Sequence, residues 1–151
     1  MFFIDEAMTP QEIKKEITKL LKPIKVISKR FNVQVQYENK LVNADEMKSQ
    51  IHELMLLLKQ HKDEKQQIHI DKLHNLNINL DLFLKSVNAL EEVERALIYY
   101  LLLADKTQTE LTEHEEMYDL LEAEYPSQSK ISRLFQKACF NLFELINYNK
   151  V

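Results

Sequence analysis

Apolar residues recur at helical spacing close to the beginning of the chain. They form one stripe: Ile13, Ile17, Leu20, Ile24, Ile27 and Phe31. The stripe predicts an amphipathic helix over residues 10–31. Thr9 can cap this helix, with Glu12 three residues later, and Pro10 suits the first helical position. Pro23 removes one helical hydrogen bond, so we expect a kink or a break there.

The pattern changes after this helix. Apolar and polar residues alternate over residues 31–37, which predicts a short strand, and the mainly polar segment 38–43 predicts a loop. Residues 44–66 predict a helix with heptad spacing, which is typical of a helix that pairs with another. The seam of this pairing helix consists of Met47, Ile51, Leu54, Leu58 and His61.

Residues 68–82 fit more than one structure. Ile68 and Ile70 alternate like a strand and could pair with residues 33–37, whereas residues 75–79 look irregular. A single long helix is then predicted over residues 81–103. Its inward residues are Leu84, Val87, Leu90, Val93, Leu97, Tyr100 and Leu101.

The C-terminal part predicts two helices joined by a short turn. Residues 112–123 form the first, residues 124–126 connect them, and Ser127 can cap the second. The apolar face of the second helix consists of Ile131, Leu134, Phe135, Ala138, Leu142 and Leu145. This layout is typical of a DNA-reading helix-turn-helix, although two helices of any small bundle share it. We therefore expect an N-terminal helical region over 1–68 and a helix-turn-helix domain over 69–151.

Phe140 and Phe143 make the distal half of the last helix apolar on a second side. This side can be covered by another part of the chain or by a second subunit. Together with the pairing seam, it leads us to expect a homodimer.

Composition favours a mostly α-helical bundle with at most one short two-stranded β ribbon. The 151 residues include no glycine, which excludes Gly-rich phosphate loops and disfavours hairpin-rich folds. The single cysteine, Cys139, suits a reducing compartment, and we expect a cytoplasmic protein. The apolar run over residues 96–104 is too short to span a bilayer, so no membrane partner is expected.

Charge is unevenly distributed around a net value of −4. Seven basic residues lie between Lys14 and Arg30, with one acid among them. Eight acids lie between Asp105 and Glu124, and the sign returns to positive after Tyr125. Two basic segments thus flank an acidic one, which would repel phosphates beside a DNA-reading helix.

Three segments of the chain carry a family resemblance. They are Leu90-Glu-Glu-Val-Glu-Arg-Ala-Leu-Ile-Tyr-Tyr-Leu-Leu, Met117-Tyr-Asp-Leu-Leu, and Ser127-Gln-Ser-Lys-Ile-Ser-Arg with Ala138. Together they resemble the C-terminal part of the ArpU-type phage transcriptional regulators, whose helix-turn-helix is similar to sigma factor region 4. The opening Met1-Phe-Phe-Ile-Asp-Glu before a Lys-rich helix is also similar. The resemblance implies a DNA-binding regulator of phage or prophage late genes, with host RNA polymerase as a further partner.

The polar residues at the start of the last helix are the expected contacts to double-stranded DNA. They are Ser127, Gln128, Ser129, Lys130, Ser132, Arg133 and Lys137. Arginine can donate two hydrogen bonds to guanine, while lysine and serine suit phosphate oxygens. Secondary phosphate contacts are expected from the N-terminal basic helix: Lys14, Lys15, Lys19, Lys22, Lys25, Lys29 and Arg30.

Other functional classes receive less support. The five histidines lack a usual zinc spacing, and no local signature indicates catalysis, so we expect no metal, no cofactor and no enzyme. The alternative to DNA binding is a helical interaction module, such as an antirepressor or inhibitor, that binds a protein partner. The acidic segment before the last helix favours this alternative.

Overall fold

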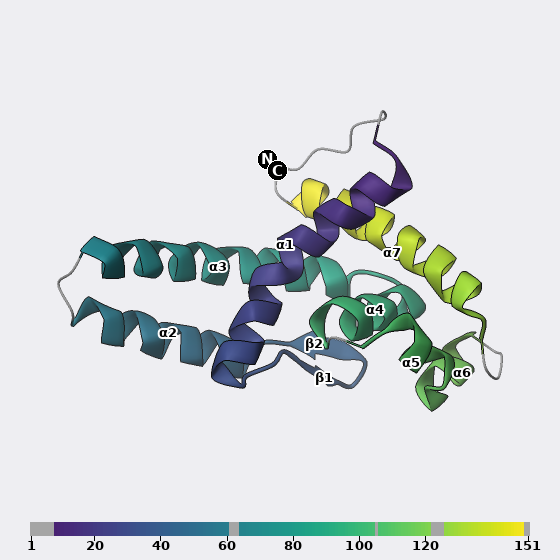
Figure 1. Cartoon of the computed structure of the whole chain (residues 1–151), viewed down its shortest axis with the longest axis horizontal. Helices are drawn as coiled ribbons and strands as arrows, with labels where there is room; N and C mark the ends of the chain where they lie inside the picture. The colour runs from purple at the N-terminus through teal and green to yellow at the C-terminus, as the bar shows by residue number, and fades with distance from the viewer. Residues whose placement is uncertain (1–7, 61–63, 105, 122–125, 150–151) are drawn as a thin grey trace.

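A computed structural model describes residues 8–60, 64–104, 106–121 and 126–149. Within them the protein is mostly α-helical with one short β ribbon, as predicted (Figure 1). The elements in chain order are α1 (Pro10–Phe31), β1 (Gln36–Glu38), β2 (Leu41–Asn43), α2 (Asp45–Lys59), α3 (Glu64–Asn88), α4 (Glu92–Ile98), the π-helix η1 (Tyr99–Leu103), α5 (Gln108–Thr112), α6 (Glu115–Leu121) and α7 (Gln128–Asn149).

Helix α1 has the predicted bounds. The Thr9 hydroxyl accepts a hydrogen bond from the Glu12 backbone N–H at 3.2 Å, and Asn32 ends the helix in the left-handed conformation. The helix continues through Pro23, so the alternative of a break there was wrong. Pro23 and Lys19 both lie on the exposed face, where water can replace the lost hydrogen bond.

The β ribbon forms next to the expected strand but with a different partner. Tyr37 in β1 faces Val42 in the antiparallel β2, so the loop predicted over residues 38–43 was partly wrong. Asn39 and Lys40 make the two-residue turn with φ of 52° and 65°. Asparagine supplies the positive φ that this turn needs at its first position, so the ribbon forms without glycine.

Helices α2 and α3 form an elongated antiparallel pair (Figure 1). The helix predicted over residues 44–66 ends at Lys59, and α3 includes the segments predicted as strand or irregular, from Ile68 to Asn79. Tertiary packing overrides the low helix propensity of the asparagines there. Met47 and Ile51 of the pairing seam are fully buried, so this helical pairing occurs within the chain, while His61 lies outside the described residues.

The long helix predicted over residues 81–103 is interrupted instead. The side chain of Asn88 ends α3 by donating to the Val42 carbonyl at 3.0 Å and accepting from the Val42 N–H at 2.8 Å. Arg95 donates to the carbonyls of Lys40, at 2.7 Å, and Leu90, at 3.0 Å. Contacts with the β ribbon therefore fix the break, and apolar spacing carries no sign of them.

Helix α7 crosses α1 and packs against α4, which joins the two ends of the chain (Figure 1). The buried core is continuous from Ile13 in α1 to Ile146 in α7. The predicted division between residues 68 and 69 falls within α3, and it stays a prediction. Among the described helices, none is long and apolar enough to cross a membrane.

Candidate nucleic-acid interface

The start of α7 is built as the sequence predicts. The Ser127 hydroxyl accepts a hydrogen bond from the Lys130 N–H at 3.1 Å, which is an N-cap contact. One face of the helix is buried: Ile131, Phe135, Ala138 and Leu142 are at most 3% exposed. The opposite face of the first turns is free to present polar side chains.

Those side chains line a shallow polar hollow of about 430 Å³ between α5 and α7. Its lining consists of Gln108, Gln128, Ser129, Ser132, Arg133 and Gln136. Gln128 donates from Nε2 to the Thr109 hydroxyl at 2.9 Å, which ties α7 to α5. Arg133 is exposed and forms no ion pair with a described residue. Four predicted DNA contacts thus share one surface, and Lys137 is also exposed, one turn beyond Arg133.

The helices before α7 differ from those predicted. Residues 112–123 were expected to form one helix, but α5 ends at Thr112 and α6 covers only Glu115–Leu121. Thr107 caps α5 in a capping box with Glu110, which starts a helix inside the segment predicted as a connection. The expected turn residues Glu124 and Tyr125 lie outside the described residues.

Besides Ser127 and Gln128, two lysines among the predicted contacts have roles within the fold. The Lys130 ammonium donates to the Leu121 carbonyl at 3.4 Å, near the end of α6. The Lys14 ammonium lies 5.2 Å from the centre of the Phe135 ring, where a cation is attracted to the π system and links α1 to α7. Both side chains would give up part of these contacts to reach a phosphate.

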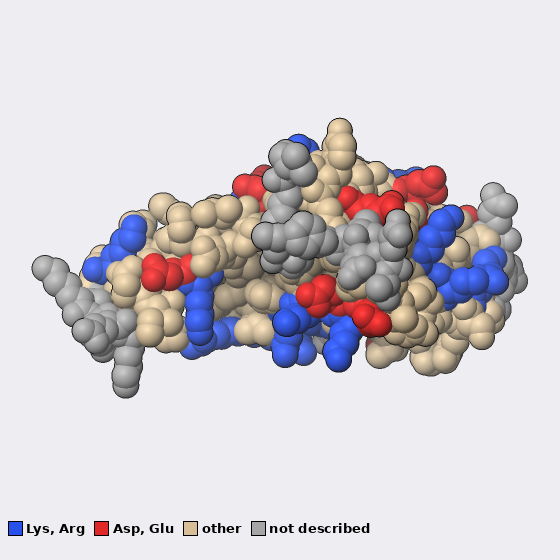
Figure 2. All heavy atoms as spheres, turned by 90° about the horizontal axis from the view of Figure 1, so that it is seen from above, with Lys and Arg blue, Asp and Glu red and all other residues tan. Residues whose placement is uncertain are grey.

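The remaining basic residues of α1 are spread along the helix. Lys15, Lys19, Lys22, Lys29 and Arg30 are exposed, and Lys25 is half-buried. Figure 2 shows Lys and Arg side chains in separate groups on one face of the molecule, with Asp and Glu side chains between some of them. The coloured atoms of this view therefore form no single positive surface.

Exposed acidic side chains lie on α6, between α5 and α7 in the chain. Glu113, Glu115 and Asp119 are exposed on or beside α6, as the acidic segment of the sequence suggests. A phosphate backbone lying across α6 would meet repulsion, whereas one lying beyond the start of α7 would meet Arg133 and Lys137.

Sequence reasoning missed an aromatic cluster that joins β1, η1 and α6. Tyr37 stacks on Tyr99 with ring centres 4.7 Å apart, and Tyr100 packs edge-on against both. The Tyr100 hydroxyl donates a hydrogen bond to the Glu116 carboxylate, and burial together with this bond raises the pKa of Tyr100. The His114 ring also contacts Tyr100, with ring centres 4.7 Å apart. The π-helix turns both of its tyrosines toward the β ribbon, which no helical periodicity predicts.

Two further polar groups are enclosed beside α7. Glu94 is 6% exposed, and both of its carboxylate oxygens accept from Asn141 Nδ2, at 3.0 Å and 2.6 Å. Cys139 is fully buried, and burial raises the pKa of its thiol to about 12, as suits a packing residue. The described residues contain no group of three potential metal ligands among His, Cys, Asp and Glu.

Comparisons with known protein families, with curated proteins and with solved structures found no match. The resemblance to ArpU-type regulators therefore stays a prediction.

Proposed function

We propose that the protein binds double-stranded DNA through the first turns of α7. The observation that carries this proposal is the polar surface of Gln128, Ser129 and Arg133, which are exposed, with the half-buried Ser132 beside them. The same helix is held rigidly by its buried face and by the Gln128–Thr109 hydrogen bond. A fixed helix with arginine and amide side chains on its exposed N-terminal half suits recognition of base edges in the major groove.

The biological setting follows from the resemblance and is part of the same proposal. The protein would act in the cytoplasm on late genes of a phage or prophage and would also contact host RNA polymerase. Phe143 is buried within the chain, whereas Phe140 is 39% exposed and is available to a second copy. The homodimer would place two α7 helices on one DNA site.

Substitution of Arg133 tests the reading surface. Arg133→Ala should weaken binding to the cognate site by about 1–3 kcal/mol and relax specificity at one base pair. Lys137→Ala should instead weaken binding to all sequences alike and reduce the salt dependence. Titration of labelled DNA from the protein's own locus at two salt concentrations measures both effects.

A matched control is Lys85→Ala, which removes an exposed charge from α3 and should leave DNA binding unchanged. The proposal fails if no fragment binds above background at low salt, where electrostatic attraction is strongest.

The alternative function, a helical interaction module, has one specific observation in its favour. Exposed acids lie on or beside α6, next to the proposed reading surface, where they would weaken attraction to DNA. If DNA binding is absent, the α5–α6 surface is the place to look for a basic protein partner.

A further inference from the structure

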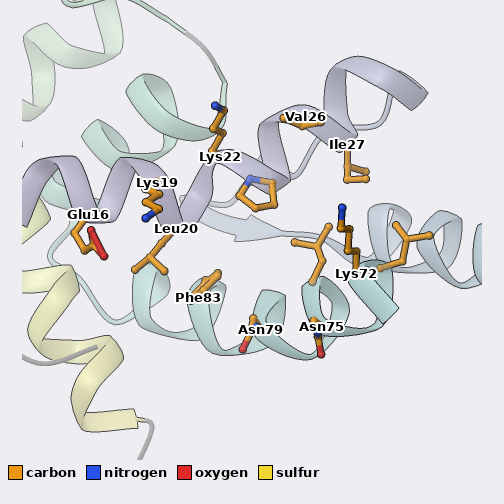
Figure 3. A pocket seen from close by; sticks show the side chains of 13 residues that line it. Glu16, Lys19, Leu20, Lys22, Val26, Ile27, Lys72, Asn75, Asn79 and Phe83 are labelled. Carbon is orange, nitrogen blue, oxygen red and sulfur yellow. The ribbon is translucent and has the colours of Figure 1, made fainter. Parts of the chain in front are cut away.

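An open groove runs between α1 and α3, away from the polar hollow of α7. One face of each helix contributes to its walls, as the recurrence of lining residues at steps of three and four shows. Figure 3 shows Leu20 and Phe83 facing one another at one end, and Ile27 above Lys72 at the other. The cavity has a volume of about 720 Å³.

The floor of this groove is apolar. Phe83 and Leu76 are buried, with 4% and 9% exposure, and Leu20 and Leu73 are half-buried. Val26 is 49% exposed at the edge. The groove is partly open, and Leu20, Leu73 and Val26 supply most of its accessible apolar surface.

The length of the groove favours an elongated occupant. The lining residues of α3 extend from Lys72 to Phe83, which corresponds to about 16 Å along the helix axis. Three turns of a second helix fit this length.

The charges around the groove indicate which kind of helix it would bind. Lys19, Lys22 and Lys72 line the groove, against the single acid Glu16. Lys19 and Lys72 reach toward the space between the helices, while the Lys22 ammonium points outward (Figure 3). None of the three lysines forms an ion pair with a described residue. Their charges are therefore available to carboxylates of a partner.

We propose that this groove binds an acidic amphipathic helix of a partner protein. Apolar side chains at positions i, i+4 and i+7 of the partner would pack on Leu20, Leu73 and Val26, the more accessible apolar side chains of the groove. Its Asp or Glu residues would face Lys19 and Lys72 across the rim. This is helix-in-groove recognition, in which apolar contacts give affinity and rim charges select the partner.

The test uses the full chain and two synthetic helical peptides of about four turns. Both carry leucines at i, i+4, i+7 and i+11, and the remaining positions are mainly glutamate in one and lysine in the other. The glutamate peptide should bind, measured by fluorescence anisotropy, and the lysine peptide should bind at least about tenfold more weakly. Chemical-shift changes in the ¹⁵N-labelled protein should fall on α1 and α3.

Two variants of the groove and two matched controls locate the contact. Lys19→Glu combined with Lys72→Glu should weaken binding of the glutamate peptide by about tenfold. Val26→Glu should weaken it by a similar factor. Ile78→Glu and Lys85→Glu change exposed α3 residues that do not line the groove and should have no effect. Circular dichroism verifies that each variant is folded.

Three results would overturn the proposal. One is equal affinity for the two peptides. Another is an equal loss of affinity for the glutamate peptide in the groove variants and in the control variants. The third is a molar mass, measured by light scattering, that is lower than the wild-type value for Val26→Glu and for no other variant. That result would identify a second copy of this chain as the occupant.

Discussion

In the described backbone, residues other than glycine adopt the positive φ angles that glycine usually supplies. Positive φ occurs at Asn32, Asn39 and Lys40. Asparagine tolerates this conformation, but lysine does so at a cost. The Lys40 carbonyl accepts a hydrogen bond from Arg95 at 2.7 Å, which restrains the turn, and its ammonium forms an exposed ion pair with Glu92 at 2.7 Å. A glycine-free chain can therefore form a tight hairpin when neighbouring helices hold its turn.

The end of α1 offers a direct test of this conformational cost. Asn32 has φ of 54° and its N–H donates to the Ser28 carbonyl. Asn32→Ala should lower the free energy of unfolding by about 1 kcal/mol, because alanine is strained in the left-handed region. Asn32→Gly is the matched control and should be neutral or slightly stabilising. Urea unfolding of the two variants gives the comparison, and equal stabilities would show that the cap conformation is not what matters.

The residue-scale features of α1 and α7 were predictable because they are local. Thr9 and Ser127 cap the helices that follow them, and each acts within three residues of its own position. The conformation of Lys40 could not be predicted, since its partners Glu92 and Arg95 are more than 50 residues away.

At the scale of elements, apolar spacing works where one helix has one buried face. It gave the bounds of α1 and the buried face of α7. It failed between α3 and η1. The apolar pattern there is nearly continuous, but the helix is interrupted where the side chain of Asn88 hydrogen-bonds to the β ribbon. The exposed polar side of α7 was predictable, but the polar hollow also needs Gln108 of α5, a helix that lies in a segment predicted as a connection. The groove was not predictable, because it needs the relative placement of α1 and α3.

The π-helix η1 makes a testable contribution through Tyr100. Tyr100→Phe removes the hydrogen bond to Glu116 and should lower the free energy of unfolding by about 1–2 kcal/mol at neutral pH. Because the folded protein raises the pKa of Tyr100 above its ordinary 10.0, this contribution is complete below pH 10 and is lost as the pH rises further.

The difference in stability between wild type and Tyr100→Phe should therefore narrow above pH 10. Urea unfolding at pH 8 and pH 11 measures it, with Tyr148→Phe as an exposed control that should change nothing. A difference that stays constant over this range would contradict the role given to the Glu116 contact.

On the scale of the whole molecule, one continuous core includes residues from both predicted regions. Ile17 of α1 and Ile146 of α7 are both fully buried in it. We therefore expect a single cooperative transition in urea, with coincident curves from circular dichroism and tyrosine fluorescence. Two separate transitions would instead support independent regions divided between residues 68 and 69.

The packing of α1 against α7 also has a consequence for synthesis on the ribosome. Helix α1 ends at Phe31, and α7 begins at Gln128, nearly 100 residues later. At ordinary translation rates this separation corresponds to roughly 5–20 s. During that interval the apolar stripe of α1 emerges without the helix that covers it in the finished fold. The nascent chain is therefore exposed to aggregation and to chaperone binding until α7 has been made.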